Sequence, residues 1–445
     1  MMSAHNHQSM SPSGEAELGR STLSRVSRRL LPFLVALYIW AWIDRTNLAI
    51  AALEMKQDLR LSSSAYGFGA GIFFLGYALF EVPSNLILVR VGARRWIARI
   101  AISWGLVATA MMFVRTPVQF YVVRVLLGVA EAGFVPGIIY YLGLWFPARE
   151  RGVATARFMV AAPLAGFLGN ALGGWMLGLG GKLGLHGWQW LFLIEGIPSI
   201  VLGVAALRML TDRPEDAEWL SNEQREWLVA RLRQGDARTA PSHQLTPSRA
   251  LAHPMLWLLA FMNCLMAMPS LAYSFWAPLF VREAIHTSTI ATGFAIAGIA
   301  CVAIVAMLLN GAYSDRTGRP SLHAGAGAAL VATGCLGAAF LPNAMSRVAA
   351  LALVEIGMRS YVPPFLCLAP ALLRGTAAAA GIALVNTAFS VGGFFGPSLI
   401  GWFKDSTGTT NGAFLFLGTV SLIAAALCIA IRRHPAFGDL LTRSR

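Results

Sequence analysis

Long apolar segments separated by short polar loops recur along the 445-residue chain. Most are close to the roughly 20 residues that a helix needs to cross a bilayer, so each is predicted to be a membrane-spanning helix. We count twelve of them. The first six are at 31–53, 66–89, 96–114, 118–144, 152–176 and 189–209, and the second six are at 253–281, 289–312, 321–341, 347–371, 376–403 and 411–432.

A polar segment divides the apolar segments into two groups of six. The predicted units are an N-terminal tail at 1–30, a six-helix bundle at 31–209, a linker at 210–252, a second six-helix bundle at 253–432 and a C-terminal tail at 433–445. Within the linker, residues 221–233 predict a short amphipathic helix on the cytoplasmic surface, with Trp227, Leu228 and Leu232 on one side. A binding site for a regulatory partner is the alternative for this helix.

The two halves repeat one another. GFLGNALGGW at 166–175 and GFFGPSLIGW at 393–402 match at six of ten positions with a constant offset of 227, and Arg90-x-Gly92 matches Arg316-x-Gly318 with an offset of 226. One offset at two separate places predicts a duplicated six-helix unit. The repeated glycines are expected to let helices pack closely, with direct ligand contact as the alternative.

Composition agrees with a membrane protein. The chain is 56% hydrophobic and 13% charged, whereas soluble domains are about 25% charged. We therefore predict an all-α membrane protein. The net charge of +14 is spread between apolar segments, so we expect no nucleic-acid partner. With the N-terminus inside, 24 of the 35 Lys and Arg residues fall in inner loops and tails and seven in outer loops, which predicts that both termini are cytoplasmic.

Several chemical classes lack their usual signatures. The five cysteines form no CxxC pair and the histidines form no cluster, so we expect no metal, disulfide or cofactor. No HExxH, GxSxG or GxxxxGK[ST] motif is present, which argues against an enzyme. Residues 1–19 contain no apolar core of a cleavable signal peptide.

Two predicted spans carry charges near their centres. Asp44 and Arg45 lie in the first span, and Arg124 and Glu131 lie in the fourth. An ionisable residue at bilayer depth costs about 2.5–3.5 kcal/mol on insertion scales, which favours a functional role. Seven residues make about two helical turns, so Arg124 and Glu131 are expected to share one face. A helix end or a structural ion pair is the alternative for Asp44 and Arg45.

One loop sequence resembles a family motif. Gly311-x-x-x-Asp315-Arg316-x-Gly318-Arg319 is similar to the cytoplasmic-loop motif of the major facilitator superfamily. Its first-half counterpart keeps Arg90, Gly92, Arg94 and Arg95 but has Val89 at the aspartate position. The motif implies a charged latch between helix ends. Glu81 or Glu150 is the expected substitute for the missing acid.

Three further motifs resemble the anion:cation symporter family, which includes permeases for tartrate, glucarate, galactonate, phthalate and hydroxyphenylacetate. They are Asp44-Arg45-x-Asn47, FEVPSN at 80–85 and RVLLGVAEAGFVPG at 124–137. The resemblance implies twelve transmembrane helices in two pseudo-symmetric bundles, a monomer and a bacterial inner (plasma) membrane. It also assigns proton handling to Asp44 and Glu131. Span 10 departs from the family pattern with Glu355 and Arg359, which are spaced to pair on one helix face.

Guanidinium groups suit an organic anion because they can bind a carboxylate through two parallel hydrogen bonds. Arg45 and Arg124 are therefore the predicted substrate ligands, and protonation of Asp44 and Glu131 is expected to release them. Tyr38, Tyr77, Tyr361 and Asn386 are expected to line the cavity, with packing as the alternative for the tyrosines. The predicted function is import of a sugar acid or aromatic acid with protons by alternating access. A sodium-coupled or exchanging carrier is the alternative.

Overall fold

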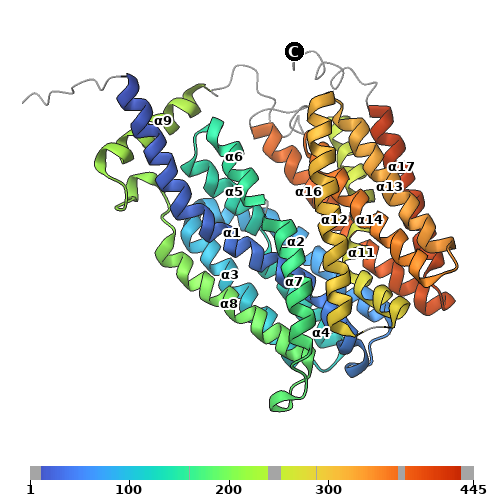
Figure 1. The fold of residues 1–445 in the computed structure, drawn as a ribbon. Coiled ribbons are helices and arrows are strands. Elements are labelled where there is room, and N and C mark those ends of the chain that lie inside the picture. The colour runs from blue at the N-terminus through green and yellow to red at the C-terminus, as the bar shows by residue number, and fades with distance from the viewer. Residues whose placement is uncertain (1–11, 160, 239–251, 287, 369–375, 432–445) are drawn as a thin grey trace, which may run out of the picture.

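The computed structural model describes residues 12–159, 161–238, 252–286, 288–368 and 376–431, and these residues are almost entirely helical (Figure 1). The first half contains α1 (Pro12–Asp58), α2 (Ser63–Val91), α3 (Ala93–Ala110), η1 (Met111–Phe113), α4 (Pro117–Glu131), α5 (Phe134–Trp145), α6 (Ala148–Met159), α7 (Ala161–Leu177), η2 (Lys182–Gly184) and α8 (Gly187–Met209). The linker contains η3 (Pro214–Asp216) and α9 (Asn222–Arg238). The second half contains α11 (Pro254–Ile285), α12 (Thr289–Thr317), α13 (Pro320–Phe340), α14 (Ala344–Leu366), α16 (Thr376–Thr407) and α17 (Asn411–Ile431).

Eleven helical segments in the described part of the chain are long and apolar enough to cross a membrane. The helix at the tenth expected position, α14, is not among them, because Arg347, Glu355 and Arg359 lower its hydropathy. It nevertheless packs against α11, α12 and α13 within the second bundle. The predicted all-α membrane architecture is confirmed, and the polar tenth helix belongs to it.

The predicted fourth span is interrupted. Its helix ends at Glu131, and a new helix begins at Phe134. Gly133 between them has φ +82°, in the left-handed region that glycine adopts without strain. A Cβ at this position would lie 2.5 Å from Oγ of Ser84, so both conformation and space favour glycine here.

The first helix is longer than the sequence predicts. It begins at Pro12, so the described part of the predicted tail is helical. Val26 is fully buried, and a Cβ on Gly19 would lie 2.5 Å from the Trp227 ring of α9. The predicted linker helix is therefore present, but α1 covers part of its apolar side. Residues 1–11, 239–251 of the linker and the predicted tail at 433–445 lie outside the described residues.

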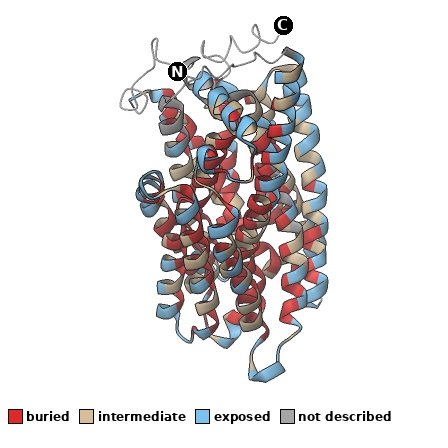
Figure 2. Ribbon diagram, turned by 90° about the vertical axis from the view of Figure 1, so that its left-hand side faces the viewer, coloured by how far each residue is buried: buried red, intermediate tan, exposed pale blue. Residues whose placement is uncertain are grey.

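The exterior of the helices carries many exposed apolar side chains. Buried residues concentrate between the helices, while exposed residues lie along their outer faces and at the loops (Figure 2). Leu79, Leu308 and Leu309 are examples, each more than half exposed. Water would not favour this arrangement, whereas lipid tails solvate such side chains well.

The halves meet at the ends of the helices opposite α9, which we call the far end. There the Asp405 carboxylate accepts hydrogen bonds from the backbone N–H groups of Ser63 (3.0 Å) and Ser64 (2.7 Å) at the start of α2. Nη1 of Arg282 donates to the Leu53 carbonyl at 2.9 Å. These contacts hold the far end closed.

The repeated glycines contribute symmetrically to this closure. Gly401 of α16 packs against the Ser63 carbonyl at the start of α2, and its repeat partner Gly174 of α7 packs against Thr289 at the start of α12. Gly169 and Gly173 pack against α1. The predicted close packing is therefore confirmed at these positions, whereas Gly166 has no neighbour within 4 Å of its Cβ position and lines a central cavity.

Candidate functional site

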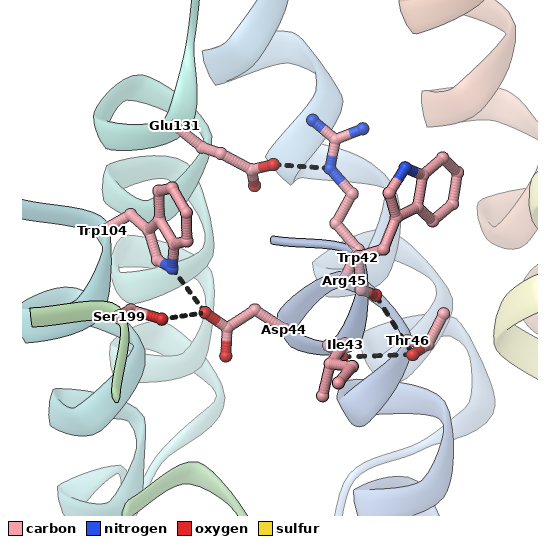
Figure 3. A network of polar contacts seen from close by, with 8 residues as sticks. All are labelled: Trp42, Ile43, Asp44, Arg45, Thr46, Trp104, Glu131 and Ser199. Atoms are coloured by element: carbon pink, nitrogen blue, oxygen red, sulfur yellow. Dashed lines mark hydrogen bonds and ion pairs between the residues drawn. The ribbon is translucent and has the colours of Figure 1, made fainter. Parts of the chain in front are cut away.

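An ion pair joins α1 to α4 inside the first half (Figure 3). Nε of Arg45 lies 2.6 Å from Oε1 of Glu131, whose side chain is 3% exposed against 22% for Arg45. The terminal nitrogens of the guanidinium point away from the carboxylate. Its carbon lies 5.1 Å from the centre of the Tyr77 ring, a cation–π contact. Two of the four predicted charges are thus in direct contact.

The end of helix α4 at Glu131 explains why this carboxylate needs a partner. A helix C-terminus carries partial negative charge, so a carboxylate in the last turn is unfavourable there. Glu131 is the last residue of α4. The Arg45 guanidinium offsets both this unfavourable interaction and the cost of burying the carboxylate.

Asp44 does not face the arginines. One carboxylate oxygen, Oδ2, accepts hydrogen bonds from Nε1 of Trp104 on α3 and from Oγ of Ser199 on α8, the latter at 3.0 Å. Within the described residues it forms no ion pair. The expectation that Asp44 restrains an arginine is therefore wrong in this conformation, because successive helical residues point about 100° apart.

Arg124 is buried against backbone carbonyls. Its Nε and Nη2 donate to the carbonyls of Gly69 (3.1 Å) and Ala70 (3.2 Å) in α2, and its guanidinium lies 4.8 Å from the centre of the Phe73 ring. Its side chain is 2% exposed. It forms no ion pair with Glu131 or any other described carboxylate, so the groups in direct contact with its positive charge are neutral.

A small cavity lies between the halves. It has a volume of about 50 Å³. The lining comes from α1, α7, α11, α12 and α14 and includes Trp42, Thr46, Gly166, Asn170, Tyr273, Ser274, Glu355 and Arg359. Glu355 and Arg359 pair at 2.7 Å, as their spacing predicts. Pockets that enclose small molecules usually measure about 300–1,000 Å³, so this cavity is too small to hold such a ligand.

The remaining predicted ligands are placed differently from one another. Tyr77 lies beneath Arg45, and Tyr38 stacks on Phe158 with 4.4 Å between ring centres. Tyr361 instead stacks on Phe365 inside the second bundle and does not line the central cavity. Tyr361 lies two positions after Arg359 in the helix, so the two side chains leave it on different faces.

Asn386 forms a link between the halves. Its side-chain amide donates to the Glu81 carboxylate, joining α16 to α2. Glu81 is 4% exposed. The sequence predicts Glu81 to be a substitute latch acid or a structural anchor and does not predict this contact with Asn386.

The loop motifs at the α9 end are open to solvent. Asp315, Arg316 and Arg319 are exposed, and none of them forms an ion pair with another described residue. Gly318 has φ +62° and closes the end of α12. In the first half, Arg90, Arg94 and Arg95 are exposed, and Gly92 has φ +98°.

The acid that contacts the first-half motif comes from the linker. Asp212 accepts a hydrogen bond from the Arg94 backbone N–H at 2.9 Å, and a Cβ on Gly92 would lie 2.7 Å from the same carboxylate. Neither Glu81 nor Glu150 takes this place, contrary to the expectation. Glu81 is already bound to Asn386.

Comparison with known proteins agrees with this architecture. The family model described as "Major Facilitator Superfamily" matches residues 34–396. A protein of Agrobacterium vitis named "Putative tartrate transporter" is 44% identical over 94% of this chain and 92% of its own length. A protein of Acinetobacter baumannii named "Quinolone resistance transporter" is 36% identical over 92% and 94%. The crystal structure of a D-xylose-proton symporter aligns with a TM-score of 0.70 at 16% identity, over 91% of this chain and 97% of that chain.

These matches run across both halves and the linker, and they agree with the symporter-family resemblance of the motifs. The matching family model and these relatives are those of transporters and not of enzymes. The chain belongs to the Major Facilitator Superfamily.

Proposed function

We propose that this protein imports a small organic carboxylate together with protons, by alternating access. The observation that carries the proposal is the Arg45–Glu131 ion pair at 2.6 Å, in which Glu131 is buried and Arg45 is half-buried. A guanidinium bound to an internal carboxylate is blocked from binding a substrate carboxylate in the same geometry. Protonation of Glu131 removes that competition, so proton binding and substrate binding favour one another.

Arg124 supplies the second half of the binding site in this proposal. It is almost completely buried and is held by carbonyls and aromatic rings only. An entering carboxylate would neutralise the charge of Arg124 and could accept parallel hydrogen bonds from two of its three guanidinium nitrogens. The arginines therefore favour an anion over a neutral sugar.

The closed far end and the small central cavity support the conformational change that alternating access requires. The Asp405, Arg282 and glycine contacts hold the halves together on one side. The exposed latch residues on the other side are free to change partners. Rocking of the halves about the cavity would then expose Arg45 and Arg124 to each side in turn. With the predicted orientation, the far end faces away from the cytoplasm of a bacterial inner membrane.

Tartrate is the first substrate to test. The Agrobacterium vitis relative carries that compound in its name, and a hydroxy acid with two carboxylates could engage both arginines. Sugar acids and aromatic acids share the carboxylate and form the rest of the substrate class that we propose.

Uptake of labelled acids into proteoliposomes tests the proposal. We expect accumulation of at least one acid only with an inward proton gradient, with alkalinisation of the medium and loss of uptake in Arg124→Ala. Accumulation driven by sodium alone, or exchange that ignores the proton gradient, would instead support the alternative carrier.

A further inference from the structure

A second buried acidic cluster lies between α1 and α8, away from both arginines. Asp44 and Asn47 are one turn apart on α1, and Glu195 and Ser199 are one turn apart on α8. Glu195 is 0% exposed, and Asp44 and Asn47 are 3% exposed. The Ser199 hydroxyl, which binds Asp44, also lies 3.3 Å from the Glu195 carbonyl, and Trp40 of α1 donates to that carbonyl at 2.6 Å. These contacts lock the two helix faces together.

The cluster contains oxygen atoms with no hydrogen-bond partner. Both carboxyl oxygens of Glu195 are unpartnered, as are Oδ1 of Asp44 and Oδ1 of Asn47. Asp44, in contrast, accepts two hydrogen bonds at its other oxygen, from Trp104 and Ser199. A buried acceptor without a donor is costly, so a proton bound between these oxygens would satisfy groups that are otherwise unmatched.

No positively charged side chain in the described residues pairs with the carboxyl groups of this cluster. Ser199 relates the two acids, since its hydroxyl donates to Asp44 and lies near the backbone carbonyl of Glu195, and Glu131 on α4 is a third acid close enough to act on Asp44. From α3 the cluster receives the neutral indole of Trp104. Two neighbouring carboxyl groups buried without a cation favour the binding of a proton, because the proton reduces both their repulsion and the cost of burying negative charge.

We propose that Asp44 and Glu195 together form a proton-binding site of this transporter, in which one proton is shared between the two carboxyl groups. The O–H bond forms on one carboxyl, and the other accepts the hydrogen bond. On release, that O–H bond breaks and the proton passes to a water molecule that reaches the cluster, while α1 and α8 move together as parts of the first half. Glu195 is thus a partner in proton binding and not only a packing residue. The inference deepens the proposed proton coupling and rests on it.

Glu195→Gln tests the pair because it preserves shape and removes the shared proton. The amide of the new residue can donate to Asp44 permanently, so Asp44 no longer needs a proton. We would record infrared difference spectra of the purified full-length protein in liposomes during a shift from alkaline to acidic buffer, without substrate. Beside the C=O stretching band from protonation of Glu131, the wild type should show a second such band from this pair, which Glu195→Gln removes and Glu195→Asp shifts. Proton uptake in the same shift should fall by about one proton per chain in Glu195→Gln.

Glu283→Gln is the matched control, because Glu283 lies at the exposed far end beside Lys404 and should leave the band unchanged. A band and proton uptake that persist unaltered in Glu195→Gln would overturn the inference. If Glu195→Gln fails to insert, an unshifted band in Glu195→Asp would overturn it equally. This measurement uses protons as its probe, so it remains decisive even if transport of every tested acid proves independent of protons.

Discussion

At the scale of single residues, the central feature is that one guanidinium has two possible carboxylate partners. Arg45 is bound to Glu131 through Nε in the structure, and a substrate carboxylate that binds the guanidinium through Nε and a terminal nitrogen would compete for that donor. A charge-assisted hydrogen bond contributes about 1.5–3 kcal/mol, so the protonation state of Glu131 can decide which partner wins.

Glu131→Gln should uncouple transport from protons. The amide cannot carry a net charge, so Arg45 is available to substrate at every pH. We expect exchange of substrate to continue while accumulation driven by a proton gradient is abolished. Counterflow and gradient-driven uptake in the same proteoliposomes measure the two activities, and undiminished accumulation would show that Glu131 is not the coupling residue.

Substrate affinity should also depend on pH in a defined direction. Acidification protonates Glu131, frees Arg45 and should strengthen binding of the anion, whereas alkaline conditions restore the ion pair and weaken it. Titration calorimetry with tartrate across pH should show this trend in the wild type and a flat profile in Glu131→Gln. A wild-type affinity that falls on acidification would have the wrong sign for the mechanism.

Arg124→Lys should separate charge from geometry. Lysine keeps the positive charge but loses the planar fork and its contacts with Gly69 and Ala70. Loss of one charge-assisted hydrogen bond worth about 1.5–3 kcal/mol predicts roughly ten- to hundredfold weaker binding. Arg347→Lys, at the exposed start of α14, is the control. Equal affinities in the two variants would remove Arg124 from the binding site.

At the scale of helices, the sequence predicted the membrane spans and their close packing better than the places where helices end. Apolar length and the repeat offset identified the spans and the glycine contacts of α7 and α16, because both depend on local pattern and backbone spacing. The polar helix α14 was also recognised, despite Glu355 and Arg359. The break after Glu131 was missed, since Gly133 alone does not reveal whether a helix continues through it.

Gly401→Ala should weaken closure at the far end. Its Cβ would lie 2.2 Å from the Ser63 carbonyl of the other half, so the helices must separate slightly. Overpacking of this kind costs about 1–3 kcal/mol, or roughly five- to hundredfold in the closed-to-open ratio. A cysteine at Thr46 should then react faster with a membrane-impermeant thiol reagent added from the far side.

Gly298→Ala is the matched control for this experiment. It adds the same methyl group to a membrane helix, but no atom lies within 4 Å of the new Cβ. Any gain in intrinsic helix propensity is common to both variants. An equal rise in reactivity in both would show that the Gly401 contact does not control closure.

At the scale of the whole molecule, the packing of the helices determines which partners each charged side chain contacts, and the sequence alone does not predict these partners. Asp44 and Arg45 are neighbours in the chain, yet one faces α3 and α8 while the other faces Glu131 of α4. Asp212 reaches the first-half loop motif from the linker, and α9 packs on an extended α1. Such contacts join segments far apart in sequence, so no local pattern contains them.

Under the proposed proton-coupled import, transport is electrogenic whenever more protons than substrate charges move inward. Each net charge then gains about 2.3 kcal/mol per 100 mV of membrane potential. The proton-to-substrate ratio therefore determines how much the membrane potential contributes to accumulation of the substrate.

The most direct test of the account is uptake of labelled tartrate, sugar acids and aromatic acids into proteoliposomes with and without an inward proton gradient. We predict that one acid accumulates above its external concentration only with the gradient, and that both accumulation and alkalinisation disappear in Arg124→Ala. Uptake of an acid that merely equilibrates, with no response to the proton gradient in the wild type, would contradict proton-coupled import.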